Sequence, residues 1–226
     1  MNAKQPLIKL ESLCRYFNSN GLVTRAIHNL DLEIYPGEYV SISGPSGCGK
    51  STLLSILGLL DGATKGNYYL KQHKVEHFDL YQKAALRNKE VGFVFQAFNL
   101  IGDMTIFENV ELPLTYSNVK KNNRKQRVME ILDQVNMAHR KDHFPAQLSG
   151  GQQQRVAVAR GMIINPSILL ADEPTGNLDS ANGKEIMDLL DQLNQQGTTI
   201  CMVTHDARFA QRATRTIKLL DGQLLQ

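Results

Sequence analysis

Apolar and polar residues alternate at 7–13 and 28–34, as they do in strands that bury one face. Runs at 38–43, 67–71 and 91–95 have the length and composition of further strands. The hydrophobic pattern therefore predicts that the first part of the chain folds largely as β-structure.

Helical spacing takes over in the middle of the chain, from residue 105 to about 165. Within 123–137, apolar side chains recur three, four and seven residues apart, which is the pattern of one buried helix face. After this region the strand pattern returns. The other expected elements are helices at 49–59, from about Gly150 and at 181–195, and strands at 167–173, 198–204 and 215–220.

A series of strands, a helical insertion and then strands alternating with helices is typical of an α/β protein with a mostly parallel sheet. We expect a single domain over 1–226. Within it, residues 1–96 and 161–226 form an α/β core, and residues 97–160 form a helical subdomain.

Composition excludes several classes of protein. The chain has 226 residues, 42% of them hydrophobic and 21% charged, with a formal net charge of +3. That charge is too small to predict nucleic-acid binding. No apolar run approaches the ~18 residues of a membrane span, and the N-terminus has no signal-peptide core.

Three cysteines without metal-ligand spacing favour a reducing cytosol over a disulfide framework. Cys14 and Cys201 lie in apolar, strand-like surroundings and are expected in the core. Cys48 lies inside a glycine-rich loop, where we expect a small space-filling residue.

The segment KKNNRKQR at 120–127 carries five basic residues. One interpretation is the solvated face at the start of a helix. The other is contact with anionic lipid headgroups or with an acidic partner surface.

A phosphate loop stands out in GPSGCGKST at 44–52. Gly44, Gly49, Lys50 and Ser51 match the G-x4-G-K-[ST] pattern, between a predicted strand and a predicted helix. The glycines let backbone N–H groups surround a phosphate, and the helix N-terminus favours negative charge. Lys50 is expected on the β- and γ-phosphates of a nucleotide. The Ser51 hydroxyl is expected on Mg²⁺, which prefers oxygen ligands.

Two acids, Asp172 and Glu173, end the predicted apolar strand ILLADE. Side chains alternate along a strand, so the two carboxylates are expected to point in different directions. We assign Asp172 to the metal shell. Glu173 is assigned to a water beside the γ-phosphate, as general base.

Two other polar residues end predicted strands of the same sheet, where ligands gather at the carboxyl ends. His205 follows MVT and is expected to contact the γ-phosphate or the water. Gln96 follows VGFVF, where the helical insertion begins. Its amide can touch Mg²⁺ or water and can respond to movement of the insertion.

A second glycine-rich helix start lies at QLSGGQQQR, residues 147–155. A small hydroxyl residue and two glycines at a helix N-terminus form an anion site. A chain with one phosphate loop has no evident use for a second.

Together these motifs resemble the nucleotide-binding subunit of ABC transporters over essentially the whole chain. The matching segments are GPSGCGKS (Walker A), Gln96 (Q-loop), LSGGQQQR (signature), ILLADEP (Walker B), GNLDS with Asp179 (D-loop) and VTHD (H-loop). The resemblance implies a P-loop NTPase core with an antiparallel β part, and ATP and Mg²⁺ as cofactors.

The resemblance also implies a use for the second glycine-rich helix start. In the family, two cassettes pair head to tail, and the signature of one caps the ATP held by the Walker A of the other. ATP binding closes this dimer and hydrolysis opens it, and the helical subdomain passes the movement to membrane subunits.

The family stacks adenine on an aromatic residue near the N-terminus. Tyr16 and Phe17 are both candidates, and counting back from AIHNLDLEI favours Phe17. The expected nucleotide-binding residues are Phe17, Gly44, Pro45, Ser46, Gly47, Cys48, Gly49, Lys50, Ser51, Thr52, Ser149, Gly150, Gly151, Gln152 and Asp179. The expected metal ligands are Ser51, Gln96 and Asp172, and the expected catalytic residues are Glu173, His205 and Gln96.

Three segments, 98–114, 145–160 and 170–180, are most similar to the macrolide-exporter and lipoprotein-releasing (MacB/LolD-like) branch. That branch implies an ATPase at the cytoplasmic face of the membrane. It is held there by a separate permease of the MacB/LolCE type with a large extracytoplasmic domain.

Other members of the family stay open as alternatives. A signalling ATPase of the cell-division (FtsE-like) kind and an importer ATPase both share these motifs. Repair-type ABC ATPases are disfavoured, because the stretch between Lys50 and Asp172 has no room for their long coiled coil.

Overall fold

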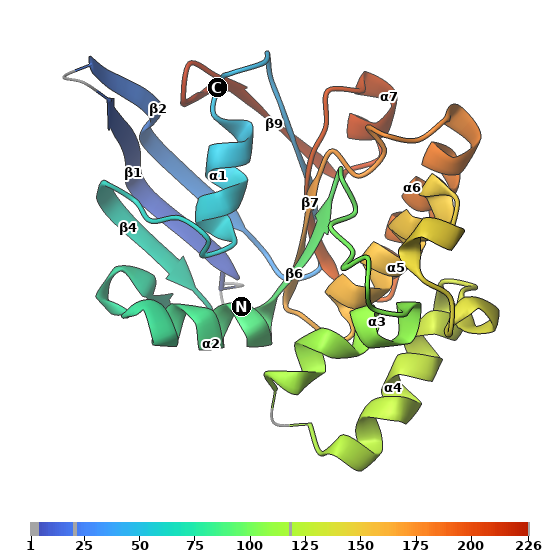
Figure 1. Cartoon of the computed structure of the whole chain (residues 1–226). Coiled ribbons are helices and arrows are strands. Elements are labelled where there is room, and N and C mark those ends of the chain that lie inside the picture. The colour runs from blue at the N-terminus through green and yellow to red at the C-terminus, as the bar shows by residue number, and fades with distance from the viewer. Residues whose placement is uncertain (1–4, 20–21, 118, 226) are drawn as a thin grey trace.

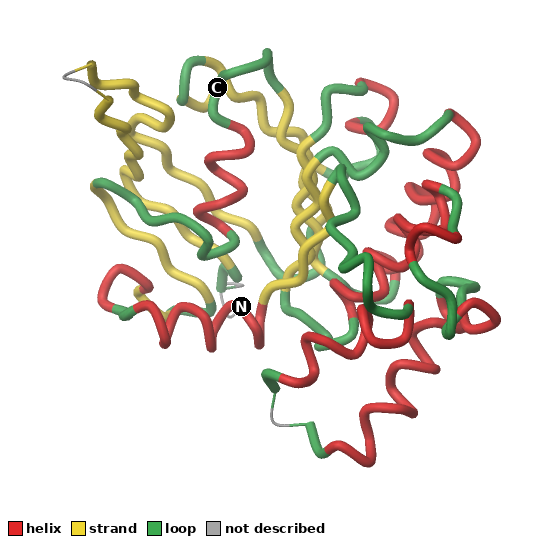
Figure 2. The backbone as a smooth tube through the Cα atoms, in the orientation of Figure 1, coloured by secondary structure: helices red, strands yellow, loops and turns green. Residues whose placement is uncertain are grey.

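The computed structural model describes residues 5–19, 22–117 and 119–225, which form two sheets and the helices around them (Figures 1 and 2). The smaller sheet is antiparallel, with strand order β2-β1-β4-β5. Its strands are β1 (Ile8–Ser19), β2 (Leu22–Ile34), β4 (Lys65–Leu70) and β5 (His73–Lys74).

The larger sheet has strand order β10-β9-β3-β8-β7-β6. All neighbours in it are parallel except β10, which is antiparallel to β9. Its strands are β3 (Tyr39–Ser43), β6 (Val91–Phe95), β7 (Ile168–Asp172), β8 (Thr199–Val203), β9 (Arg215–Leu220) and β10 (Gln223–Leu225). The predicted α/β fold, with a mostly parallel sheet and an antiparallel part, is confirmed.

Helices lie on both sides of the larger sheet (Figure 1). They are α1 (Lys50–Leu57), α2 (Leu80–Glu90), α3 (Ile106–Thr115), α4 (Lys121–Gln134), α5 (Gly150–Met162), α6 (Ser180–Gln195) and α7 (Ala207–Ala210). Short 3₁₀ turns span Val75–His77, Ala138–Arg140 and Pro145–Gln147.

The alternation of strand side chains divides the interior into two cores. On β7, Ile168 and Leu170 pack with α1 and the antiparallel sheet, whereas Leu169 and Ala171 face the helices α3 to α6. Helix α1 therefore lies between the two sheets, as Figure 1 shows. Because β7 is buried on both faces, its sequence is a continuous apolar run rather than an alternating one.

Several predicted boundaries change. The helix predicted at 123–137 is α4, which begins at Lys121 and ends at Gln134. Helix α2 was missed because it is mostly polar and exposes most of one side. Its start carried a readable signal, since Asp79 and Gln82 form a capping box.

The division at 97 and 160 stays a prediction. The helices α3 and α4 fall inside the proposed helical subdomain, but α5 runs on to Met162 and packs against β6 of the larger sheet. Helix α5 is thus shared between the proposed subdomain and the core.

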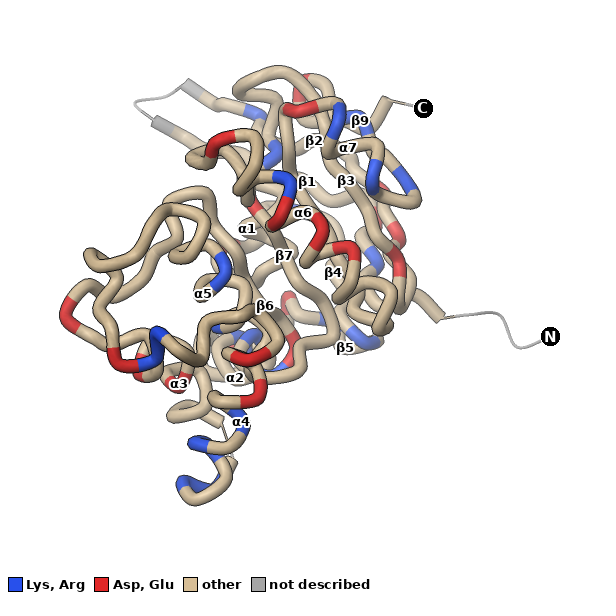
Figure 3. The backbone as a smooth tube through the Cα atoms, turned by 90° about the vertical axis from the view of Figure 1, so that its right-hand side faces the viewer, with Lys and Arg blue, Asp and Glu red and all other residues tan. Residues whose placement is uncertain are grey.

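The basic segment 120–127 lies on the first half of α4, where Figure 3 shows Lys and Arg gathered. Arg124 donates to the carbonyl oxygen of Val119, and Arg127 to that of Ile163. The three lysines of the segment are exposed. The segment is therefore the start of a helix, with part of its charge used to hold neighbouring backbone.

No helix within residues 5–19, 22–117 and 119–225 combines the length and the apolar character needed to cross a bilayer. Cys14, Cys48 and Cys201 are all buried and free of disulfides. The expected core positions of Cys14 and Cys201 are confirmed, and burial raises the pKa of the Cys201 thiol to about 12.

Candidate functional site

The carboxyl ends of four parallel strands lie at one edge of the larger sheet. Register pairs Phe95 with Asp172, Asp172 with Val203, and Val203 with Ile42. The residues that follow these strand ends therefore meet at this edge. They include the phosphate loop after β3, Gln96 after β6, Glu173 after β7 and His205 after β8.

The phosphate loop joins β3 to α1 and requires glycine where other backbone comes close. A Cβ on Gly49 would lie 2.3 Å from the carbonyl oxygen of Ala26, and one on Gly44 would lie 2.1 Å from that of Leu219. Gly49 is also the N-cap of α1, has a φ of 103°, and provides no side-chain cap. The first N–H groups of α1 thus keep their capacity to bind an anion.

Lys50 is buried at the first position of α1. Its ammonium donates to the carbonyl oxygens of Gly44 and Pro45, at 2.9 and 2.8 Å. These bonds hold the positive charge against the backbone of the phosphate loop.

Ser51, in the first turn of α1, lies beside Asp172 at this edge. Burial, together with the charge of Glu173, raises the pKa of Asp172, while Ser51 and Lys50 oppose the rise. One hydroxyl and one carboxylate fit Mg²⁺, which usually binds few protein ligands and takes phosphate and water oxygens for the rest.

Glu173 does not follow the alternation expected of a strand residue. Strand β7 ends at Asp172, and Glu173 has a φ of 45°, in the left-handed region. Its N–H donates to the carbonyl oxygen of Val203, and its carbonyl accepts from Gly176. A tight turn, rather than the pleat, therefore sets the direction of this carboxylate.

The carboxylate of Glu173 meets the ring of His205. Oε2 lies 3.1 Å from Nδ1, and the His205 side chain is 68% exposed. A protonated Nδ1 donates to the carboxylate, so the contact orients both groups whether or not the ring is charged.

Gln96 is held by Asn177, which lies after the Walker B segment. The Gln96 amide donates to Asn177 Oδ1 at 3.1 Å, and the Asn177 amide donates to the Gln96 carbonyl at 3.0 Å. This reciprocal pair fixes the backbone at the start of the segment that leads to the helices.

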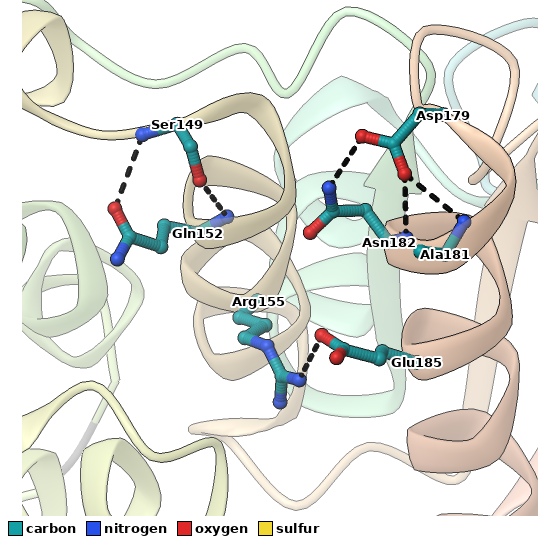
Figure 4. A network of polar contacts seen from close by, with 7 residues as sticks. All are labelled: Ser149, Gln152, Arg155, Asp179, Ala181, Asn182 and Glu185. Atoms are coloured by element: carbon teal, nitrogen blue, oxygen red, sulfur yellow. Dashed lines mark hydrogen bonds and ion pairs between the residues drawn. The ribbon is translucent and has the colours of Figure 1, made fainter.

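The second glycine-rich helix start has a different structure. Ser149 is the N-cap of α5, its hydroxyl accepts from the N–H of Gln152, and the Gln152 side chain accepts from the N–H of Ser149 (Figure 4). A Cβ on Gly151 would lie 2.2 Å from Oδ1 of Asn182 on α6. Glycine at 151 therefore lets the two helix starts pack closely.

Asp179 holds Asn182 in that place. Its carboxylate caps α6 by accepting from the N–H groups of Ala181 and Asn182, and it accepts from the Asn182 side chain at 2.6 Å (Figure 4). These N–H bonds and the Asn182 amide hold the pKa of Asp179 below its usual range. Among residues 5–19, 22–117 and 119–225, no hydrogen bond joins 149–152 to the phosphate loop.

The family pattern described as ABC transporter matches residues 27–176 of this sequence. The chain belongs to the ABC transporter family. It is 46% identical to an uncharacterised ABC transporter ATP-binding protein of Methanocaldococcus jannaschii, over 97% of this chain and 98% of the relative.

Macrolide export ATP-binding/permease proteins also match. The one from Brucella melitensis is 45% identical over 99% of this chain. The chain spans about a third, 34%, of that protein's length.

Solved ABC cassettes share the fold. A dimeric ATP-binding cassette in a post-hydrolysis state with ADP and phosphate superposes with a TM-score of 0.89, at 43% identity and 97% coverage of both chains. A subunit of the cbiONQ transporter of Clostridium perfringens gives 0.86 at 27% identity, over 98% of this chain and 87% of the subunit. The present chain is therefore an ABC-type ATPase.

For an ABC ATPase, the position of the adenine-stacking aromatic matters, and the two candidates lie differently. Phe17 is 41% exposed, with the Arg15 guanidinium 4.5 Å from its ring centroid. The Tyr16 hydroxyl instead contacts Nδ1 of His28 at 2.9 Å. Both residues lie on β1 opposite β2, the strand whose Ala26 abuts the phosphate loop, with Tyr16 paired to Arg25 and Phe17 to Thr24, so the stacking role of Phe17 stays a prediction.

The sequence analysis did not identify three polar residues that the structure places around this site. Asn177 holds Gln96, Asn182 joins the D-loop to the signature helix, and Gln154 lies buried under both strand ends. Asn182 had a signal, because Asp179 and Asn182 have the spacing of a helix cap and its third residue. The partners of Asn177 and Gln154 lie far along the chain, so spacing could not reveal them.

Proposed function

We propose that this chain is the ATPase subunit that powers a separate, macrolide-exporter-like permease, and that two copies pair head to tail around ATP. The observation that carries the pairing is the separation of two phosphate-binding helix starts within one chain. The loop at 44–52 lies among the acids of the sheet edge, whereas the helix start at 149–152 lies beside the D-loop.

The chemistry follows from the sheet edge. Lys50 and the N–H groups of α1 bind the phosphates of ATP, while Ser51 and Asp172 would hold Mg²⁺, which neutralises phosphate charge. Glu173 accepts the proton of a water that attacks the γ-phosphate, so that ADP leaves and phosphate is released. His205 holds the carboxylate of Glu173 in place through its Nδ1 contact.

The signature helix completes the site from the other copy. Ser149, Gly150 and Gly151 present a helix N-terminus, and the γ-phosphate of the second copy supplies the negative charge that this surface lacks. ATP then stabilises the closed pair because it contacts both chains, and hydrolysis removes that difference in affinity.

A groove of about 640 Å³ supports a permease partner. It lies between α2, β6 and the ends of α3 and α5, and it is lined by apolar side chains with two arginines, Arg87 and Arg160. Tyr116, at its rim, is exposed. We propose a helix of the permease as the occupant of this groove.

Two inactive variants test the pairing. A Lys50→Ala chain loses ATP binding, and a Ser149→Arg chain loses its signature. When they are mixed, each mixed dimer contains one intact composite site, with Lys50 from the second variant and Ser149 from the first. Recovery of ATPase activity on mixing is expected, and a mixture as inactive as its components would contradict head-to-tail pairing.

The permease is tested by gentle extraction of the tagged chain from its own membranes and identification of what co-purifies. A permease with few spans and a large extracytoplasmic domain is the expected result. A permease with a solute-binding protein would favour an importer, and a bound wall hydrolase would favour the cell-division signalling alternative.

A further inference from the structure

Gln154 is a buried polar side chain that the proposed chemistry does not use. It lies on α5, one turn after Ser149 and the glycines, and it is fully buried, with 0% exposure. Its amide nitrogen donates to two carbonyl oxygens, that of Phe95 at 3.3 Å and that of Pro174 at 2.6 Å. Both amide protons are therefore used.

The two acceptors flank the proposed catalytic residues. Phe95 is the last residue of β6 and directly precedes Gln96, and Pro174 directly follows Glu173. Strands β6 and β7 are neighbours, with Phe95 paired to Asp172. One side chain of the signature helix thus bridges the backbone at both catalytic strand ends.

The same helix also binds the backbone that follows Gln96. Arg160, six residues further along α5, donates to the carbonyl oxygens of Phe98 and Asn99, at 2.9 and 2.5 Å. Phe98 and Asn99 both have positive φ, at 60° and 52°. Gln154 and Arg160 therefore bind the backbone before and after Gln96, so this loop is attached to α5 at both ends.

The acceptor oxygen of Gln154 shows that the residue does more than fill space. Oε1 is buried and has no hydrogen-bond partner among residues 5–19, 22–117 and 119–225. A buried acceptor without a partner is costly, and an apolar residue of similar shape would avoid that cost. The two donated bonds are what the glutamine provides there.

We propose that Gln154 is a positioning residue for hydrolysis. It fixes the backbone next to Gln96 and Glu173 and ties both to the helix whose start faces the phosphate of the second copy. This link to the second copy rests on the proposed head-to-tail pairing, whereas the effect on Glu173 within one chain does not.

The first test separates binding from turnover in the full chain. Gln154→Met keeps the length of the side chain and removes both donors. We expect kcat to fall about tenfold to a hundredfold, as for loss of a positioning contact, while the dissociation constant for ATP changes less than about twofold. Gln154→Glu, which places oxygens against both carbonyls, should lose at least as much and gives a second variant if the first folds poorly.

Asn109→Leu is the matched control. Asn109 is another fully buried amide, on α3, and it donates to the carbonyl oxygens of Ile101, Met104 and Thr105. The Asn109→Leu variant should lower the melting temperature about as much as Gln154→Met does, and it should leave kcat near the wild-type value. Equal kcat losses in both variants, or wild-type kcat in Gln154→Met, would overturn the proposal.

The mixed dimer then locates the effect. Gln154→Met is added either to the Ser149→Arg chain, which hydrolyses ATP, or to the Lys50→Ala chain, which supplies the signature. The proposal expects the larger loss when the change is in the hydrolysing chain. A larger loss in the signature-supplying chain would show that Gln154 only supports the start of α5. If the mixture without any Gln154 change is already inactive, the pairing has failed, and the kcat comparison still decides the role of Gln154.

Discussion

The chain contains two glycine-rich helix starts, and their surroundings differ in what they provide. At the start of α1, Gly49 offers no side-chain cap, and the side chains of Ser51, Asp172 and Glu173 gather at the same sheet edge. At the start of α5, Ser149 caps the helix itself, and Asn182, which is held by Asp179, packs against it.

This difference shows why similar sequence patterns have different roles. The first helix start lies beside the residues that we propose to bind phosphate and metal and to accept the proton, and the proposed cover for the γ-phosphate comes from elsewhere. The second would supply that cover, and its own carboxylate, Asp179, is used to cap α6 and to hold Asn182. We therefore expect substitutions at either place to lower turnover while ATP still binds, by different amounts and for different reasons.

The largest effect on turnover is expected at the sheet edge beside the start of α1. Glu173→Gln removes the proposed base and retains the shape of the side chain, so ATP should still bind and close the dimer. We expect turnover to fall about a hundredfold or more, in line with loss of a general base. Phosphate release gives the rate, and size-exclusion chromatography with ATP shows the trapped dimer. A rate near that of the wild type would exclude Glu173 as the base.

A substitution at the start of α5 should lower turnover without lowering the affinity for ATP. Gly151→Ala puts a methyl group 2.2 Å from Asn182 Oδ1, and Asp179 holds Asn182 in place, so one helix start must shift. We expect turnover to drop about tenfold, since small misplacements at a site cost one to two orders of magnitude. The dissociation constant of the monomer for ATP should stay unchanged.

Gly102→Ala is the control for that change, because a Cβ at Gly102 meets no atom within 4 Å. It should behave as the wild type. A normal rate in Gly151→Ala would mean that the contact between α5 and α6 adapts freely and that the second site is more tolerant than its packing indicates.

A smaller effect is expected for the aromatic residue proposed to stack on adenine, near the phosphate loop. Phe17→Ala should weaken ATP binding by about 1–3 kcal/mol, the range for losing one stacked aromatic. Titration with a fluorescent ATP analogue measures it. Tyr16→Phe removes only the hydroxyl that contacts His28 and serves as control. Unchanged affinity in Phe17→Ala would transfer the stacking role to Tyr16.

The sequence alone predicted which residues lie at the first place and at the second. Strand ends and glycine loops are local patterns, and the parallel sheet brings their carboxyl ends together, so Lys50, Asp172 and Glu173 could be assigned to one edge. The direction of Glu173 could not be predicted, because a positive φ after the strand sets it rather than the pleat.

The links between the two places could not be predicted either. The bonds of Gln154 to Phe95 and Pro174 join segments 59 and 20 residues apart in the chain, and no periodicity marks them. Helix α2 was missed for another reason. It is mostly polar, so the hydrophobic pattern that identified α6 was absent.

The smallest effect on turnover is expected for a substitution far from both helix starts. It serves as a control, because it should lower stability and leave kcat unchanged. Glu90, at the end of α2, is buried, which by itself would raise the pKa of its carboxyl. Hydrogen bonds from Ser167 and Lys71 outweigh this and hold that pKa below its usual range. Glu90→Gln should cost about 1–2 kcal/mol of unfolding free energy at pH 7 and leave kcat unchanged.

The pH dependence of this loss follows from the sign of the shift. A carboxyl whose pKa is lowered by folding stabilises the fold above its unfolded pKa, about 4.3, and that contribution disappears as pH falls through the folded value. The difference in melting temperature between wild type and Glu90→Gln should therefore be full at pH 7 and shrink below about pH 4. Glu130→Gln, on the exposed side of α4, should show almost no difference at either pH. A gap for Glu90→Gln that widens in acid would mean that burial, rather than the bonds from Ser167 and Lys71, governs this carboxyl.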